Sequence, residues 1–403
     1  MNAPNAMRRR SYVSCLAAAA AVLAVAVAAQ EPGDSTSLVL LDGRTLKASS
    51  LAISAGKLAG EGVPEGLSLD DLRRIDLSGA AAPVQNAAVV LDLRGGGRVL
   101  GKTATIGDDT CRLEWSHGEK LTLPIDVVRA VRLDPATPHP EFDKAVAAPA
   151  ADADRIFFQV DGKFDRLSGL IVSLTADELT FQFEGQERTL PRNRLYGIAL
   201  AQAQADEDRT RCLVFLKDGS RLAGDLTNLA DGQATVELPG GGKAAFPWSA
   251  TVKVEIRSSR VAYLSDLNPT SAQESPLVTL TRPWQRDKNV LAGPLTLGTK
   301  IYDKGIGVHA RSSLTFAAGK QYDTLAAVIG IDAAAGGKGD CVFSVLGDGQ
   351  PIYSQRVQGN DPPRVLKVEI GGYDEVTLLV EPGADLDLAD HANWCDVRMI
   401  KAK

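Results

Sequence analysis

Five side chains in the last quarter of the chain have the chemistry of a sugar-binding site: Tyr302, His309, Asp390, His391 and Trp394. Sugars offer flat apolar C–H faces and many hydroxyls, so a sugar site needs an aromatic ring for stacking and a few fixed groups that donate and accept hydrogen bonds. A tryptophan or a histidine serves equally well in a core, with its ring nitrogen bonded to a backbone carbonyl. Residue types alone therefore leave both roles open for His309 and Trp394.

The acidic run GADLDLADHANW is a second candidate site. Asp385 and Asp387 are two residues apart, so they point the same way in an extended chain, and Asp390 follows within a turn. Carboxylate oxygens gathered in one loop are ligands that calcium prefers. The run therefore predicts a calcium site at these three residues, with a solvated acidic loop as the alternative.

Catalytic motifs are missing from the sequence. It contains no G-x-S-x-G nucleophile turn and no H-E-x-x-H zinc motif. A glycosidase needs two carboxylates at a fixed separation, one of them with a raised pKa, and small β modules seldom hold such a pair. We therefore expect a protein without enzymatic activity.

The N-terminus predicts an exported protein. Three arginines precede an apolar, alanine-rich run that ends in small residues at Ala26, Ala28 and Ala29. This order is typical of a cleaved secretory signal peptide, which we assign to residues 1–29; a retained membrane anchor is the alternative. The mature chain is expected to be secreted, periplasmic or on the cell surface, without membrane insertion after cleavage.

Composition narrows the partners and the disulfides. Lys and Arg number 44 against 50 Asp and Glu, so the chain has no bulk attraction for nucleic acid. Four cysteines follow the leader, and export permits disulfides among them, with three possible pairings. We favour Cys341 with Cys395 because both fall in the final domain, and free buried thiols are the alternative for these two and for Cys111 and Cys212.

Four degenerate repeats precede residue 257. Each opens with an apolar run, passes through a Gly/Asp turn to an arginine, and closes on a second apolar run 33 to 35 residues later. Apolar residues alternate in between, which predicts half-buried strands of a β-meander. The arginines are Arg44, Arg98, Arg166 and Arg221. Their expected role is structural, with the stem packed beside the turn and the charged head in water.

The joints between repeats suggest two pairs. The longest joint, residues 134–154, is rich in Pro and Ala and lacks a periodic apolar face, which is typical of a linker. We therefore expect two small meander or barrel-like domains at 36–133 and 155–256, each with two repeats around a shared core. Three prolines at one offset are expected to start strands or lie on sheet edges: Pro124, Pro191 and Pro247.

From residue 257 the pattern changes to short strands such as TLAAVIGI, CVFSVLGDG and EVTLLVE, separated by Gly, Asp and Pro turns. At least seven such strands predict a β-sandwich or jelly roll. The fold class is therefore all-β, with two paired-repeat domains followed by a sandwich at 257–403.

Four motifs of this last part resemble the NPCBM family of carbohydrate-binding modules. They are Tyr302-x-Lys304-Gly305-Ile306-Gly307-x-His309, Gly330-x-Asp332, Phe343-x-Val345 with Gly347-Asp348-Gly349, and Asp390-His391-x-x-Trp394. The resemblance implies a galactose-binding-like jelly roll that binds sugars, galactose-like ones among them, at one edge of the sandwich. The loop AAAGGKG at 333–339 departs from the family, in which acidic residues are more usual, and this weakens any ion site at Asp332.

Together these patterns predict an exported, non-catalytic carbohydrate-binding protein whose repeats present a C-terminal glycan-binding module. The alternative is a structural or scaffold protein whose repeats bind a protein partner and whose last module lacks sugar affinity. Calcium is the one candidate cofactor.

Overall fold

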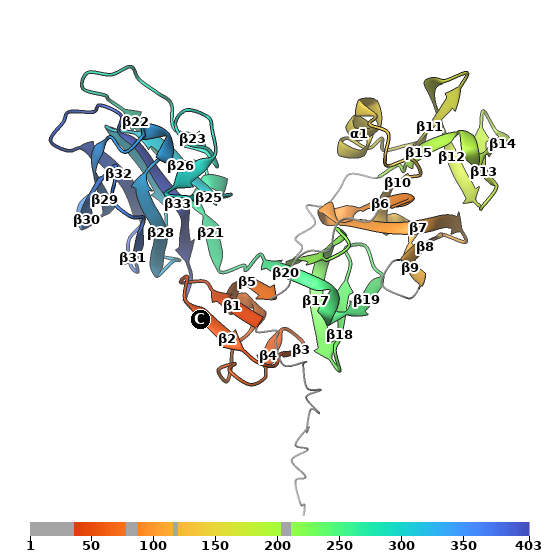
Figure 1. Cartoon of the computed structure of the whole chain (residues 1–403), viewed down its shortest axis with the longest axis horizontal. Coiled ribbons are helices and arrows are strands. Elements are labelled where there is room, and N and C mark those ends of the chain that lie inside the picture. Colours follow the sequence, from red (N-terminus) through yellow and green to blue (C-terminus); the bar gives the residue numbers. More distant parts are fainter. Residues whose placement is uncertain (1–35, 78–86, 116–119, 203–210, 403) are drawn as a thin grey trace, which may run out of the picture.

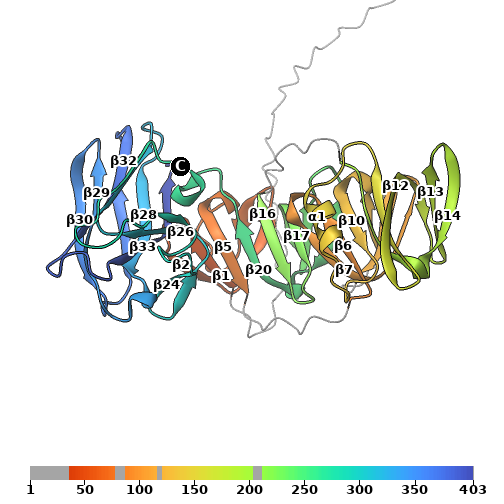
Figure 2. The ribbon, with the colours of Figure 1, turned by 90° about the horizontal axis from the view of Figure 1, so that it is seen from above.

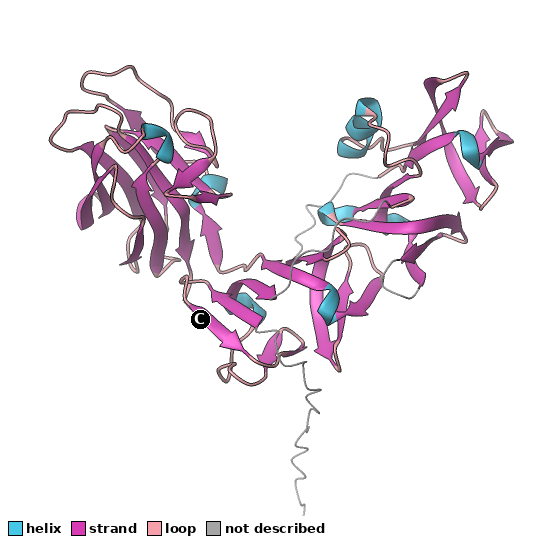
Figure 3. Ribbon diagram, in the orientation of Figure 1, coloured by secondary structure: helices cyan, strands magenta, loops and turns pink. Residues whose placement is uncertain are grey.

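The computed structural model describes residues 36–77, 87–115, 120–202 and 211–402. The expected signal peptide at 1–29 lies outside these residues. The regular secondary structure of the described part is mostly β-strand, with short 3-10 turns and a single α-helix, α1 (Pro140–Ala147), as Figures 1 and 3 show. The all-β fold class is thus confirmed. No helix in this part is long and apolar enough to cross a membrane.

Each repeat is a unit of five strands. Repeat 1 has β1 (Thr36–Leu40), β2 (Thr45–Ala48), β3 (Ala52–Ser54), β4 (Lys57–Ala59) and β5 (Leu72–Leu77). Repeat 2 has β6 (Val89–Leu93), β7 (Arg98–Gly107), β8 (Thr110–Trp115), β9 (Lys120–Pro124) and β10 (Val128–Arg132). Repeat 3 has β11 (Asp154–Val160), β12 (Lys163–Leu174), β13 (Glu178–Phe183), β14 (Gln186–Pro191) and β15 (Leu195–Ala199). Repeat 4 has β16 (Cys212–Leu216), β17 (Arg221–Ala230), β18 (Gln233–Glu237), β19 (Lys243–Pro247) and β20 (Thr251–Ile256).

Four strands of repeats 2, 3 and 4 form the expected meander, and the fifth returns to pair with the first. The Gly/Asp turns close its hairpins. Asp231–Gly232 and Glu184–Gly185 have positive φ at both positions, the geometry that matches the twist of two-residue hairpins. The recurring prolines end β9, β14 and β19 and precede a short 3-10 turn. They do not start strands, but each of these strands has one ladder partner among the described strands, so the prolines lie on sheet edges, the other expected position.

The repeats do not pair as the linker suggested. β10 of repeat 2 pairs with β15 of repeat 3, and β5 of repeat 1 pairs with β20 of repeat 4. The pairs are therefore 2 with 3 and 1 with 4, instead of 36–133 and 155–256. One core joins residues of all four repeats.

The long joint explains this error. Residues 134–154 are not a free linker, because they contain α1, whose Phe142 and Ala145 are buried against Tyr196 and Ala199 of β15 and Ala130 of β10. The extra length of this joint covers the β10–β15 ladder instead of separating two domains.

The last part of the chain is a sandwich of two antiparallel sheets around one core. The first sheet has the order β23 (Gln285–Arg286), β26 (Gly305–His309), β33 (His391–Ile400), β28 (Thr324–Ile331) and β31 (Arg364–Glu369), with β21 (Val261–Tyr263) also on β33. The second has the order β22 (Ser271–Glu274), β27 (Ser312–Ala317), β32 (Glu375–Pro382), β29 (Asp340–Gly347) and β30 (Gln350–Gln358). A hairpin of β24 (Leu295–Leu297) and β25 (Lys300–Tyr302) packs on the first sheet.

All four cysteines of the described chain are free and buried, so the favoured Cys341–Cys395 disulfide is wrong. Cys341 lies in the core between the two sheets. Cys395 follows the inward-pointing Trp394 on β33, so it faces the other side of its sheet and packs with the β24–β25 hairpin. Side chains alternate along a strand, and this alternation keeps the two thiols apart.

The sandwich is attached to repeat 1. Buried Arg398 of β33 donates from Nε and Nη2 to the carbonyl of Leu41, at 3.0 and 2.7 Å. Arg260 pairs with Asp71, with Nη1 2.5 Å from Oδ1. Burial lowers the pKa of Arg398 to about 10. The second half of β33 thus fixes the sandwich on the repeats.

Candidate functional site

Trp394 lies in the core of the sandwich. Its side chain is fully buried, and its ring meets that of Phe343 edge-on with centroids 5.1 Å apart. Its neighbours across the sheet are Ile306 of β26 and Ile329 of β28. A ring in this position presents no face to solvent, so it does not serve as a platform for a sugar.

Tyr302 is also buried. It packs with Leu295, Leu297 and Cys395, and the Lys300 ammonium lies 4.5 Å from the centre of its ring. Burial raises the pKa of its phenol to about 12. Tyr302 therefore anchors the β24–β25 hairpin on the first sheet.

The other motif residues hold the fold in the same way. A Cβ on Gly305 would lie 2.6 Å from the carbonyl oxygen of Trp394, and one on Gly307 would lie 2.4 Å from that of Lys288. The buried carboxylate of Asp332 accepts from the amides of Thr296 and Ala334 and from the side chains of Asn289 and Asn393. The motifs behind the family resemblance are therefore mainly architectural.

Of the five predicted sugar-binding residues, His309 and His391 are brought together at the sandwich edge. They are cross-strand partners in β26 and β33, and their ring centroids are 5.8 Å apart. His309 is buried, with Nδ1 2.6 Å from the carbonyl oxygen of Ala310. His391 is half-buried, and its pKa is lowered by burial and by the nearby His309 and Arg282. His391 is thus the one of the pair with accessible surface.

Asp390 is fully buried beside this pair. Its Oδ1 accepts from the amide of Asp340 at 2.8 Å, and the Cys341 thiol lies next to the carboxyl. Burial raises the pKa of Asp390 to about 6. The carboxyl therefore holds the loop before β33 in place and is closed to solvent.

Asp387 is the second buried carboxylate of the acidic run. It accepts from the amides of Leu277, Val278 and Thr279 at 2.8, 3.1 and 3.3 Å, and from the Thr279 hydroxyl at 2.9 Å. Burial opposes its ionisation, but these hydrogen bonds outweigh burial and lower the pKa of Asp387. Asp387 therefore clamps residues 277–279 to the loop before β33.

The calcium prediction fails on this geometry. Both oxygens of Asp387 accept hydrogen bonds from residues 277–279, Oδ1 of the buried Asp390 accepts from the amide of Asp340, and Asp385 is exposed. Among the described residues no group of three His, Cys, Asp or Glu side chains could hold a metal ion. Asp387 and Asp390 point into the protein and Asp385 lies in solvent, so the oxygens of the three acids do not converge on an ion.

The hydrogen bonds of Asp387 and Asp390 fix loops on which five aliphatic side chains are exposed to solvent. They belong to two loops, 275–282 and 383–390, which we call the loop rim, and they are Leu277, Val278, Leu280, Leu386 and Leu388. Each is at least half exposed, and Leu280 reaches 81%. Along LDLADH the aspartates point in and the leucines point out, which reverses the usual alternation and which sequence reasoning missed. A reversed pattern of this kind is the signal that could have found the rim.

Polar groups border the loop rim. Arg282 is exposed, and exposed Arg311 contacts Glu381, with Nη2 3.2 Å from Oε1. His391 starts β33, whose other end carries Arg398 on repeat 1. Ten strand residues span about 30 Å, so the rim lies at the end of the sandwich remote from repeat 1, where Figure 3 shows long loops.

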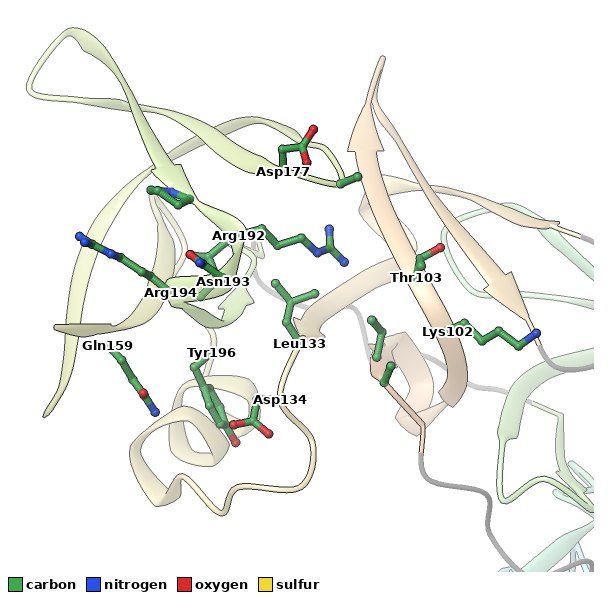
Figure 4. Close-up of a pocket in the computed structure, with 15 residues that line it drawn as sticks. Lys102, Thr103, Leu133, Asp134, Gln159, Asp177, Arg192, Asn193, Arg194 and Tyr196 are labelled. Atoms are coloured by element: carbon green, nitrogen blue, oxygen red, sulfur yellow. The ribbon is translucent and has the colours of Figure 1, made fainter. Parts of the chain in front are cut away.

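A groove of about 710 Å³ lies between repeats 2 and 3, where β7 faces the 3-10 turn Arg192–Arg194 (Figure 4). Arg192 extends toward β7, and its Nη1 donates to the carbonyls of Thr175 and Ala104 at 2.6 and 2.9 Å. Burial lowers the pKa of Arg192. Arg192 thus ties the two repeats together, and the groove belongs to their contact.

Comparisons with known proteins found a relative, solved structures and a family model that match parts of this chain. The chain is 29% identical over 216 residues to a protein of Renibacterium salmoninarum named "Putative endo-alpha-N-acetylgalactosaminidase", and the match covers 44% of this chain and 14% of that protein. This chain therefore spans only a small part of that relative.

Two solved structures of Clostridium perfringens proteins are also similar. A family 51 carbohydrate-binding module in complex with methyl-galactose is 27% identical, with 34% of this chain and 99% of that chain covered and a TM-score of 0.32. A family 51 module with INT domains of ZmpB, in complex with GlcNAc, is 21% identical, with 45% and 44% covered and a TM-score of 0.33. Residues 260–400 match the NPCBM/NEW2 domain, so the resemblance seen in the motifs is confirmed for the C-terminal third of the chain.

Proposed function

We propose that the C-terminal sandwich is a non-catalytic glycan-binding module of an exported protein and that the sugar binds on the loop rim. The observation that carries this proposal is the NPCBM/NEW2 match over the whole sandwich. The rim supports it because exposed aliphatic side chains on clamped loops lie beside an imidazole and two guanidinium groups. Apolar surface with a few fixed polar groups suits the C–H faces and hydroxyls of a sugar.

The ligand that we propose first is a galactose-like sugar, in keeping with the galactose-binding-like jelly roll expected for this sandwich. The proposed export rests on the signal peptide predicted at residues 1–29. A non-catalytic role fits the rim, because Asp387 and Asp390 are buried and hydrogen-bonded to protein, whereas a glycosidase holds two carboxyl groups open to its substrate.

Titration of the full chain with galactose, N-acetylgalactosamine and N-acetylglucosamine tests the proposal. Arg311→Ala and His391→Ala should each weaken binding about tenfold or more if their side chains bond the sugar. Lys367→Ala is the matched control, since Lys367 is an exposed cation of β31, and it should bind like the wild type. Binding that none of these variants changes would place the sugar elsewhere, and release of free sugar from a glycan would contradict the non-catalytic role.

The alternative function is a scaffold whose repeats bind a protein partner. The exposed large apolar side chains of repeat 3 favour it, because the other three repeats have none of this size among their described residues. A wild-type chain that binds nothing on a broad glycan array, yet captures a protein from a secreted extract, would favour this alternative over glycan binding.

A further inference from the structure

The repeats form a row that does not follow the sequence order. Repeat 1 lies on the sandwich, repeat 4 pairs with repeat 1, repeat 2 contacts repeat 4, and repeat 3 pairs with repeat 2. Figure 2 shows this order along the molecule, from β1 and β5 through β20 and β17 to β7 and finally β12 to β14. Repeat 3 is therefore the free end of the row.

The strand ladders that join the repeats in this row pair equivalent residues. Val131 pairs with Ile198, and each lies seven residues after its recurring proline. In repeats 1 and 4, Ile75 pairs with Val254, and both occupy the same position of the fifth strand as Val131 and Ile198. Contacts between equivalent residues are the mark of a two-fold interface, in which the same patch serves both partners. We call this patch the fifth-strand face.

A second patch, the arginine face, joins repeats 2 and 4. Arg98 of β7 pairs with Arg221 of β17, and these are the equivalent recurring arginines. The Leu100 amide donates to the Ser220 hydroxyl at 3.0 Å. The contact again relates equivalent positions, so repeats 2 and 4 each carry two faces that bind another repeat by local two-fold symmetry.

One aromatic position shows what the arginine face buries. Trp115 of repeat 2 packs on Phe246 of repeat 4, with centroids 6.1 Å apart. In repeats 2, 3 and 4 the residue before the recurring proline has a partner on the opposite strand of its hairpin. The position four residues after that partner holds Trp115 in repeat 2, Leu238 in repeat 4 and Phe183 in repeat 3. Trp115 and Leu238 are 4% and 5% exposed, whereas Phe183 is 37% exposed.

The arginine face of repeat 1 contacts the sandwich. Its turn before Arg44 receives Arg398 of the sandwich at the Leu41 carbonyl. Arg166 is largely exposed, as is Arg44. Repeat 3 differs in that Phe164 and Val160 of the hairpin that carries Arg166 are exposed as well. Within the described repeats, exposed large apolar side chains occur in repeat 3 alone. Its arginine face therefore lacks the cover that the other three have.

We propose that a second copy of this chain covers the arginine face of repeat 3, with Arg166 opposite Arg166 of the other copy. Between repeats, this face binds another arginine face through equivalent residues, and a patch of that kind is complementary to itself. Like charges do not prevent it, because Arg98 pairs with Arg221 in the same way while its Nη2 contacts Asp92 at 2.6 Å. The acid beside Arg166 is Glu141, whose Oε2 lies 4.0 Å from Nη1. The dimer places its two sandwiches at opposite ends.

A cysteine at the symmetric position tests this arrangement directly. Residues opposite each other in an antiparallel ladder have Cα atoms about 4.5 to 5.5 Å apart, within the range of a disulfide. Arg166→Cys should cross-link to a covalent dimer under mild oxidation. Arg44→Cys is the matched control, because it carries the same change at the equivalent position of repeat 1, and it should stay monomeric in denaturing gels.

Sedimentation of the full chain measures the association itself. The wild type should sediment as a dimer at micromolar concentration, and Phe183→Asp should weaken association about tenfold or more because it places a charge in the buried contact. Leu280→Asp, on the loop rim, should leave it unchanged. A wild type that stays monomeric up to about 100 μM, association that Phe183→Asp does not weaken, or cross-linking of Arg166→Cys no faster than that of Arg44→Cys would overturn the proposal.

Discussion

Trp394→Ala separates a core role from a binding role for the residue that most suggested a sugar platform. The side chain is fully buried and packs edge-on against Phe343 at 5.1 Å. Truncation of a buried tryptophan removes its transfer free energy and leaves a cavity, which together cost about 3 to 5 kcal/mol of unfolding free energy.

For a sandwich of this size, each 1 kcal/mol lowers the melting temperature by roughly 3 to 5 °C. Trp394→Ala should therefore melt about 10 to 20 °C below the wild type. Thermal unfolding followed by near-ultraviolet circular dichroism measures this on the full chain. Val365→Ala is the control, since Val365 lies exposed on β31, and it should melt within about 2 °C of the wild type.

Sugar titration of the same variant at 10 °C completes the experiment. A core tryptophan predicts that the folded variant keeps its affinity when cold, because the ring lies inside the sandwich and away from the loop rim. A variant that melts like the wild type but loses binding would refute the reasoning, since that result requires a ring exposed to the ligand.

Three further changes follow from the clamps and close contacts. Asp387→Ala removes the acceptor of three amides and one hydroxyl, so amide exchange of residues 277–279 should accelerate and sugar binding should fall, while Asp385→Ala at an exposed site should do neither. Asp390 has a pKa of about 6 when folded and an ordinary value near 4 when unfolded, so its ionisation lowers the stability of the fold as pH rises from about 4 to 6. The melting temperature of Asp390→Asn should therefore rise relative to that of the wild type between pH 4 and 7.5. A difference in melting temperature that does not change with pH would contradict the assignment. Gly307→Ala brings a methyl within 2.4 Å of the Lys288 carbonyl oxygen and should lower the melting temperature by several degrees, whereas Gly107→Ala meets nothing within 4 Å and should not.

Local patterns predicted the strands and turns well, because each depends on a few neighbouring residues. Alternating apolar positions became half-buried strands, as in β8 and β18, and Asp-Gly pairs became hairpin turns. The family motifs located the sandwich correctly at 260–400. Burial of Trp394 could not be predicted in the same way, since an aromatic residue on a strand suits a core and a surface equally well.

Which repeats pair with each other could not be predicted from the sequence, for a different reason. Every repeat carries a fifth-strand face of similar pattern, so the pattern of one strand fits any of the other three. The choice of partner depends on packing contributed by the joints, such as Phe142 of α1 against Tyr196. A helix with two buried residues in a Pro/Ala-rich stretch leaves little periodic signal, so the sequence pattern of this joint predicts a linker.

The acidic run shows how a correct chemical observation can support the wrong site. Carboxylates close together in a loop bind an ion only if their oxygens remain free and converge. Asp387 and Asp390 instead accept hydrogen bonds from backbone amides of segments that are distant in sequence, residues 277–279 and Asp340. Those partners come from other strands and loops, so the sequence around 385–390 contains no sign of them. The same hydrogen bonds turn the neighbouring leucines outward. The buried carboxylates therefore create the exposed apolar surface on which we propose that the sugar binds.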